Sequence, residues 1–248
     1  MPKEPYDVIV EALGEGVYTR LGLYDVIYRY FPSYASTSCD WVIGTLKGKG
    51  QLRSLGNGFY AKGKTTWRYE INQNQQKTLD KLMREFPNTQ VSFINSQIVN
   101  EIVGNSGGME WSFLAVDKRD LFPFYMRLRE LTKKDIMLTP TAHELSYYLR
   151  PGAIILVPLF SKSPCEKNGL FSLEKLIVDF YADRVFLNMF PGAEFEEKLM
   201  QILRIYNVNI ITTINYAKRR RVEDKIRLLF ERATPEEYRR VTGGEDAL

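Results

Sequence analysis

Two segments near the start of the chain carry apolar residues at helical spacing. The first spans residues 22–31 and ends at Pro32, and its apolar face comprises Leu23, Val26, Ile27 and Tyr30. A second helix is predicted to begin near Thr37, which can act as N-cap with Asp40 three residues on, and to end at Gly50. Its buried side is predicted to carry Trp41, Val42 and Leu46.

The next segment, residues 51–62, is predicted to form two short strands around Asn57 and Gly58. An Asn-Gly pair favours the type I′ turn of a two-residue hairpin, because both central residues of that turn need positive φ. Two short helices followed by a β-hairpin are the order of a winged helix-turn-helix module.

Residues 65–75 are polar and poor in helix signals, so we expect the domain boundary there. Strands are predicted beyond it at 89–94, 109–117, 135–139 and 152–160, and helices at 76–86, 121–131, 173–181, 195–206, 210–221 and 226–230. The sequence therefore predicts an α/β (α+β) fold. A winged helix-turn-helix domain would cover residues 1–68, and a larger mixed α/β domain ending in helices would cover 69–248.

The amino-acid composition excludes few classes of protein. The 248 residues are 44% hydrophobic, enough for a substantial core, and a net charge of +4 permits a polyanionic partner without requiring one. Cys39 and Cys165 match neither a metal motif nor a disulfide framework. With no secretory signal pattern and no apolar segment of membrane-spanning length, we expect a cytoplasmic protein with no membrane partner, no metal and no cofactor.

The stretch Leu46–Lys64 carries cations and no acidic residue. Five cations are predicted to contact DNA phosphates, with Asn57 at the tip of the wing: Lys47, Lys49, Arg53, Lys62 and Lys64. A turn centred on Asn57 and Gly58 would place Arg53 opposite Lys62 with a phosphate between them, and a turn slipped by one residue would pair Arg53 with Tyr60. The alternative is a solvated cationic hairpin that binds nothing.

Two further groups of side chains are candidates for nucleic-acid contact. Near the start of the second helix, four side chains could reach base edges, or else serve only to cap the helix: Ser36, Thr37, Ser38 and Asp40. A second basic cluster could bind phosphate or a partner, or could simply be the charged end of a helix: Lys218, Arg219, Arg220 and Arg221.

Catalytic motifs are absent from the sequence. Asp179 and Asp183 are four residues apart on a predicted helix and could share a metal, although ion pairing on a polar face is the favoured interpretation. Asp117 ends a predicted strand but has no partner motif for a nuclease site. His143 has no partner that its spacing identifies, so we expect a structural or surface histidine.

Two parts of the chain resemble the AbiEi family, the antitoxin and transcriptional-regulator component of type IV toxin–antitoxin (abortive infection) systems. The front part, "DWVIGTLKGKGQLRSLGNGFYAKG", is similar to the winged helix-turn-helix of that family, although Gly44 and Gly48 fall inside its recognition helix. The back part is similar in "SLEKLIVDFYADRVFL" and "YNVNIITTINYAKRRR", which match an E-K/R-x-L-V-D helix and a later YA-x-R helix.

The resemblance implies a non-enzymatic protein with two roles. Its first domain would bind inverted repeats in double-stranded DNA and repress its own operon, and its second domain would counter a nucleotidyltransferase-like toxin, without necessarily forming a stable complex with it. One alternative is a metal-dependent nuclease or phosphodiesterase that uses Asp117, Asp179 or Asp183 and is targeted by the winged domain. Another is an interaction module whose basic hairpin binds an acidic protein.

Overall fold

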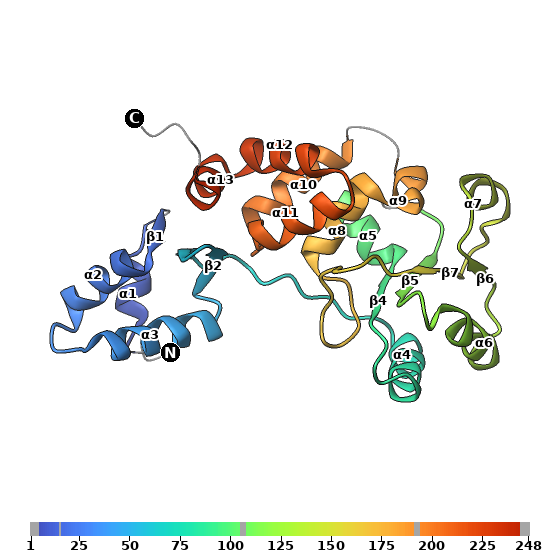
Figure 1. Ribbon diagram of the computed structural model, residues 1–248, viewed down its shortest axis with the longest axis horizontal. Helices are drawn as coiled ribbons and strands as arrows, with labels where there is room; N and C mark the ends of the chain where they lie inside the picture. Colours follow the sequence, from blue (N-terminus) through green and yellow to red (C-terminus); the bar gives the residue numbers. More distant parts are fainter. Residues whose placement is uncertain (1–4, 15, 105–107, 191–193, 244–248) are drawn as a thin grey trace. The chain divides into compact units, whose positions relative to one another are not determined.

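The computed structural model describes residues 5–14, 16–104, 108–190 and 194–243, and these form two compact units. The first unit contains residues 1–67, 200–215 and 224–248, and the second contains 68–199 and 216–223. The described chain begins and ends with helices and contains two sheets (Figure 1). The mixed α/β fold predicted from the sequence is confirmed.

The elements follow one another along the chain in three groups. The first is α1 (Asp7–Ala12), β1 (Val17–Thr19), α2 (Arg20–Tyr30), α3 (Ser36–Gly48), β2 (Leu52–Gly56) and β3 (Phe59–Lys62). The second is α4 (Gln73–Glu85), β4 (Val91–Asn95), α5 (Ser96–Val103), β5 (Trp111–Val116), α6 (Leu121–Leu131), β6 (Ile136–Leu138), α7 (Ala142–Tyr148), β7 (Ala153–Pro158), α8 (Leu173–Ala182) and α9 (Arg184–Met189). The third is α10 (Glu194–Ile205), α11 (Ile210–Arg219), α12 (Glu223–Ala233) and α13 (Pro235–Thr242).

Helices α1, α2 and α3 share one hydrophobic core in the first unit. The apolar stripe predicted for α2 is buried apart from Tyr30, and α3 buries Cys39, Val42, Ile43 and Leu46. Trp41 was predicted on the buried side of α3, and this is wrong, because 62% of its surface is exposed. Neighbouring residues of a helix point about 100° apart, so burial of Val42 turns Trp41 toward solvent.

The three-stranded sheet of the first unit has the order β1-β3-β2, with antiparallel neighbours. The predicted turn is confirmed, since Asn57 and Gly58 have φ of 50° and 77°. The predicted register of Arg53 is wrong, because Arg53 pairs with Ala61 rather than with Lys62 or Tyr60. A β-bulge between Ser54 and Gly56 adds one residue to β2 and shifts every pair beyond it by one.

The two faces of this sheet have different neighbours within the first unit. Leu52 and Tyr60 pack against the core of α1, α2 and α3. Arg53 and Val17 both align with Ala61 across the strands, and α13 contacts β1 and β2 beside that row. The bulge therefore turns Arg53 away from the helical core and toward α13.

A close backbone approach joins the end of α3 to the end of β3. The Gly63 N–H donates a hydrogen bond of 2.8 Å to the Gln51 carbonyl. A Cβ atom on Gly63 would lie 1.8 Å from the Gly50 carbonyl oxygen, so only glycine fits there. The contact brings the segment that follows α3 alongside the segment that follows β3.

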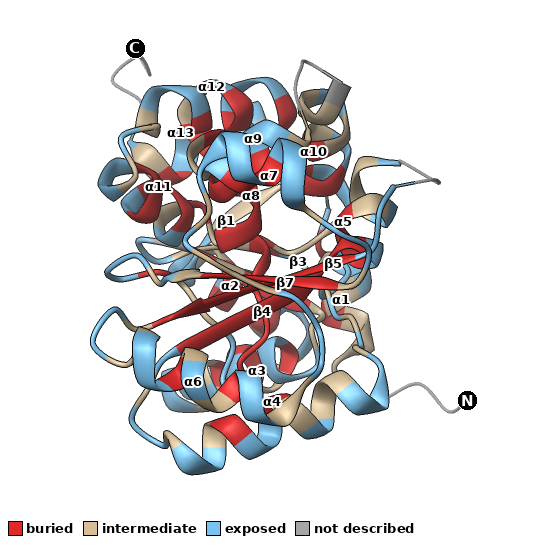
Figure 2. Ribbon diagram, turned by 90° about the vertical axis from the view of Figure 1, so that its right-hand side faces the viewer, coloured by how far each residue is buried: buried red, intermediate tan, exposed pale blue. Residues whose placement is uncertain are grey.

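The second unit contains a four-stranded sheet of order β4-β5-β7-β6. Strand β4 is antiparallel to β5, whereas β5, β7 and β6 run parallel. All residues of β4 and β5 are buried, including the polar Ser92, Asn95 and Ser112. Figure 2 shows these strands as a buried layer with helices on both sides.

The two sides of this second sheet have separate apolar contacts. On one side, Leu82 of α4 and Phe124 of α6 belong to a cluster with Phe93 and Leu114. On the other side, Phe113 of β5 lies 5.2 Å from the ring of Phe186 in α9. Helices therefore cover both faces, as expected for an α/β unit.

The expected domain division differs from the observed units in one respect. The break between residues 67 and 68 lies next to the expected boundary, but residues 200–215 and 224–248 group with the first unit rather than the second. The four helices α5, α7, α9 and α13 and the short elements α1 and β1 were not predicted. Within the described residues, none of the helices is both long and apolar enough to cross a membrane.

Candidate nucleic-acid interface

Helix α3 is fixed to α2 by a polar cluster near its first turn. Asp40 accepts hydrogen bonds from the Nε of Arg20 at 2.8 Å and from the hydroxyl of Tyr24. The Arg20 guanidinium also forms an ion pair with Asp40, and these partners hold the pKa of its carboxyl below the usual value. Asp40, a candidate for base contact, is thus engaged within the protein and positions α3 on α2.

The start of α3 differs from the capping pattern expected. Its N-cap is Ala35, which has extended backbone angles, so Ser36 is already the first helical residue. No side-chain capping hydrogen bond is described for α3, so the predicted Thr37 cap is wrong. Ser36 and Thr37 are exposed, and Ser38 is half-buried. The first backbone N–H groups and these hydroxyls lie together at the helix N-terminus, a common anion-binding arrangement.

An exposed stripe runs along α3 from Thr37 through Trp41 to Gly44. The helix continues through Gly44 and Gly48 to its end, so neither glycine interrupts it. Trp41 also contacts the ring of Tyr6, with centroids 5.9 Å apart. Sequence periodicity missed this exposed indole because Trp41 adjoins the apolar residues Val42 and Ile43.

If α3 is a recognition helix, we expect Trp41→Ala to weaken DNA binding by roughly tenfold, because an exposed aromatic ring on such a helix offers apolar contact to bases. Binding can be measured by fluorescence anisotropy on a labelled duplex. Leu21→Ala, which removes another large exposed side chain of the first unit, is the matched control. Equal DNA affinities of the parent and the Trp41→Ala variant would show that the exposed stripe of α3 is not part of the interface.

Three of the five predicted phosphate contacts are exposed: Lys47, Lys49 and Lys62. Lys47 lies in the last turn of α3, and Lys49 follows that helix as its C-cap. Lys62 ends β3, directly before the Gly63 contact with Gln51. The three lysines therefore come from the two segments that this contact brings alongside each other.

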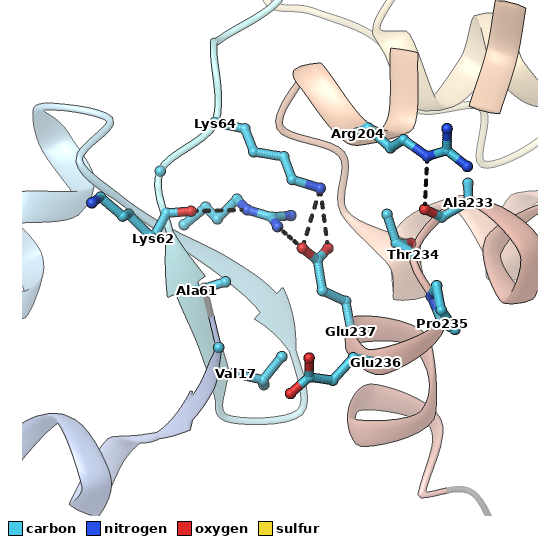
Figure 3. A pocket seen from close by; sticks show the side chains of 13 residues that line it. Val17, Ala61, Lys62, Lys64, Arg204, Ala233, Thr234, Pro235, Glu236 and Glu237 are labelled. Carbon is cyan, nitrogen blue, oxygen red and sulfur yellow. Dashed lines mark hydrogen bonds and ion pairs between the residues drawn. The ribbon is translucent and has the colours of Figure 1, made fainter. Parts of the chain in front are cut away.

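Arg53 and Lys64 are engaged in a different way from the prediction (Figure 3). The Arg53 side chain is only 3% exposed, and its guanidinium donates to Glu237 of α13 and, at 3.2 Å, to the Lys62 carbonyl. The Lys64 ammonium lies 3.1 Å from the same Glu237 carboxylate and donates to the Leu203 carbonyl at 2.8 Å. The prediction that Arg53 and Lys64 are open to a phosphate is therefore wrong for this conformation, because Glu237 already neutralises them.

Asn57, at the tip of the hairpin, also contacts α13. Its side-chain nitrogen donates to the Val241 carbonyl at 3.0 Å. The backbone φ of Asn57 is positive, so the residue serves the turn and the helix contact together.

The second basic cluster is divided by the fold. Lys218, Arg219 and Arg221 are exposed, but the Arg220 side chain is only 10% exposed. Its guanidinium lies 3.3 Å from Asp179 and 3.4 Å from Asp183. Arg220 therefore belongs to a buried network, and its assignment to the basic surface is wrong.

This network joins residues of the two later sequence motifs, "SLEKLIVDFYADRVFL" and "YNVNIITTINYAKRRR", and all its residues lie in the second unit. The Lys175 ammonium is 2.5 Å from Asp179, whose other oxygen accepts from the Tyr216 hydroxyl at 3.0 Å. Burial disfavours the charged form of Lys175, but Asp179, Tyr216 and Asp183 together outweigh it and raise the pKa of Lys175. Burial and the neighbouring Asp179 charge raise the pKa of Asp183.

The carboxylates considered for a metal are ion-pair partners in this structure. Asp179 and Asp183 pair with Arg220, and Asp117 pairs with Arg119 at 3.0 Å. No group of three potential metal ligands occurs among the residues that the structure describes. His143 lies on the exposed surface of α7, stacked near Tyr147 with ring centroids 4.5 Å apart.

A family model described as a family of unknown function (DUF6577) matches residues 38–236. The match begins within α3 and ends within α13, so it includes both the hairpin and the buried network. Comparison with curated proteins gives no match. Comparison with solved structures gives none either.

Proposed function

We propose that this chain, which belongs to the DUF6577 family, is a DNA-binding transcriptional repressor with its interface on α3 and the β2–β3 hairpin. The order α1-β1-α2-α3-β2-β3 and the three-stranded sheet support a winged helix-turn-helix. In this interpretation α3 is the recognition helix and the hairpin is the wing. The exposed lysines would contact DNA phosphates, and α3 would contact base edges.

The observation that carries this proposal is the gathering of Lys47, Lys49 and Lys62 where α3 and β3 end. These side chains are exposed, and no acidic residue interrupts the stretch from Leu46 to Lys64. A phosphate backbone supplies closely spaced anions that exposed lysines can contact. The same lysines could bind an acidic protein surface, but the uncapped α3 N-terminus and the exposed Trp41 favour a nucleic acid.

The first test is binding to the DNA immediately upstream of the gene. We expect the full-length protein to bind this duplex more tightly than a shuffled duplex of equal length, as measured by fluorescence anisotropy. The affinity should fall linearly with the logarithm of salt concentration, because counterions are released from each contacted phosphate. Absence of binding to either duplex at low salt would overturn the proposed function.

The resemblance to the AbiEi family supports a second role as the antitoxin of a type IV toxin–antitoxin system. The two motifs of that resemblance meet in the buried network of the second unit, which supports a common fold for that region. The toxin would be nucleotidyltransferase-like and encoded beside this gene. Co-expression with the neighbouring gene tests this role, and growth arrest that this protein does not relieve would contradict it.

A further inference from the structure

Arg53 and Lys64 converge on a single carboxylate although both come from the hairpin region and the carboxylate comes from α13. Glu237 Oε1 accepts from Arg53, and both carboxylate oxygens lie within reach of the Lys64 ammonium, at 3.1 and 3.4 Å. Two cations therefore share one carboxylate. The geometry is that of an anion-binding site with a protein carboxylate in it.

The site is buried but open on one side to a cavity. The Arg53 side chain is 3% exposed and that of Lys64 is 16% exposed, while Glu237 keeps 20% of its side chain exposed. The adjoining cavity has a volume of about 450 Å³, and its lining includes Lys62, Arg204 and the acidic Glu236. The Lys62 side chain points away from Glu237, and only its carbonyl faces Arg53 (Figure 3). An anion from solvent can therefore approach the same cation pair through this cavity.

Helix α13 spans the hairpin from its base to its tip (Figure 3). Glu237 lies in its first turn and reaches Arg53, while the carbonyl of Val241 in its last turn reaches Asn57 at the turn. The helix has eight residues, a length at which an isolated helix is unstable in water. Its ordered state therefore depends on these contacts and on the burial of Tyr238 and Val241.

We propose that α13 is an internal competitor of DNA, with the Glu237 carboxylate in the position that a backbone phosphate takes when DNA is bound. This inference rests on the proposed DNA-binding function. A phosphodiester carries the same single charge as the carboxylate and suits the fork of an arginine, so Arg53 stays neutralised in both states. DNA binding then releases α13 from the hairpin, and the free protein is partly self-inhibited.

The test compares Glu237→Gln with Glu236→Gln, which makes the same charge change at the preceding, exposed residue. We expect Glu237→Gln to bind the upstream duplex about tenfold tighter, within the range of about 5- to 150-fold typical of coupled sites. Glu236→Gln should stay within about twofold of the parent.

Hydrogen exchange on the unaltered protein gives a readout that does not depend on how the variants fold. Amides of α13 should exchange faster when the duplex is added, since release from the hairpin exposes them. Unchanged protection of α13 in the complex, or equal affinity of the parent and Glu237→Gln, would overturn the role of α13 and leave the DNA-binding function standing. Failure of every variant and of the parent to bind DNA would instead count against the function itself.

Discussion

Asp179→Asn is expected to destabilise the protein by about 3–5 kcal/mol, the usual effect of removing one partner from a buried ion pair. The Asp179 side chain is fully buried, and its loss would leave Lys175 without its closest anion and Arg220 with Asp183 alone. The free energy of unfolding can be measured by urea denaturation of the full-length chain. The matched control is Asp117→Asn, in which an exposed arginine loses its carboxylate partner, and we expect little change there.

A double variant distinguishes the effect of the ion pair on stability from the effect of side-chain packing. Lys175→Met with Asp179→Leu replaces both charges by apolar side chains of similar length, so it should be more stable than either single variant. Arg220 keeps Asp183 as its partner in that variant. A double variant as unstable as the sum of the singles would mean that Lys175 and Asp179 do not act as a pair.

The triple variant Lys47→Gln, Lys49→Gln, Lys62→Gln is expected to lose roughly two orders of magnitude in affinity for the upstream duplex at low salt. Each lost phosphate contact lowers the slope of log K against log salt by about 0.9, so three should lower it by about 2.7. Anisotropy titrations over a series of salt concentrations give both quantities. Because these lysines are exposed, the fold should be retained.

A second triple variant tests whether DNA affinity depends on where the removed charges lie or only on how many are removed. Lys218→Gln, Arg219→Gln and Arg221→Gln remove the same charge from the exposed part of the second basic cluster. We expect a smaller loss of affinity and a nearly unchanged salt slope. An equal loss in both triple variants would mean that the hairpin lysines are not the principal phosphate contacts.

Short stretches of sequence predicted many of the helices, strands and turns. Ser172 caps the helix predicted at 173–181, accepting a hydrogen bond from the Lys175 N–H, and the strand predicted at 152–160 contains β7. The Asn57-Gly58 turn also follows from residue chemistry alone, because few residue pairs accept two positive φ values. In each case the residues that determine the element lie close together in the sequence.

The errors at the candidate interface have two physical origins. The bulge before Gly56 depends on tertiary packing, because its extra residue, Leu55, is fully buried. No short-range sequence rule predicts where such a residue is inserted. The partner of Arg53 is Glu237, which lies 184 positions further along the chain, so no local sequence pattern could predict the contact. Helix α13 itself had a readable signature, with Pro235 in its first turn and Gly243 after its end.

The placement of α13 against the hairpin also affects when the protein can finish folding during synthesis. The first 67 residues leave the ribosome early, but the carboxylate that neutralises Arg53 is made 184 residues later. At about 5–20 residues per second, this interval lasts roughly 10–40 s. During that interval Arg53 must stay hydrated, so the sheet of the nascent chain lacks its final packing on one face. Completion of the first unit thus waits for α13 to be translated.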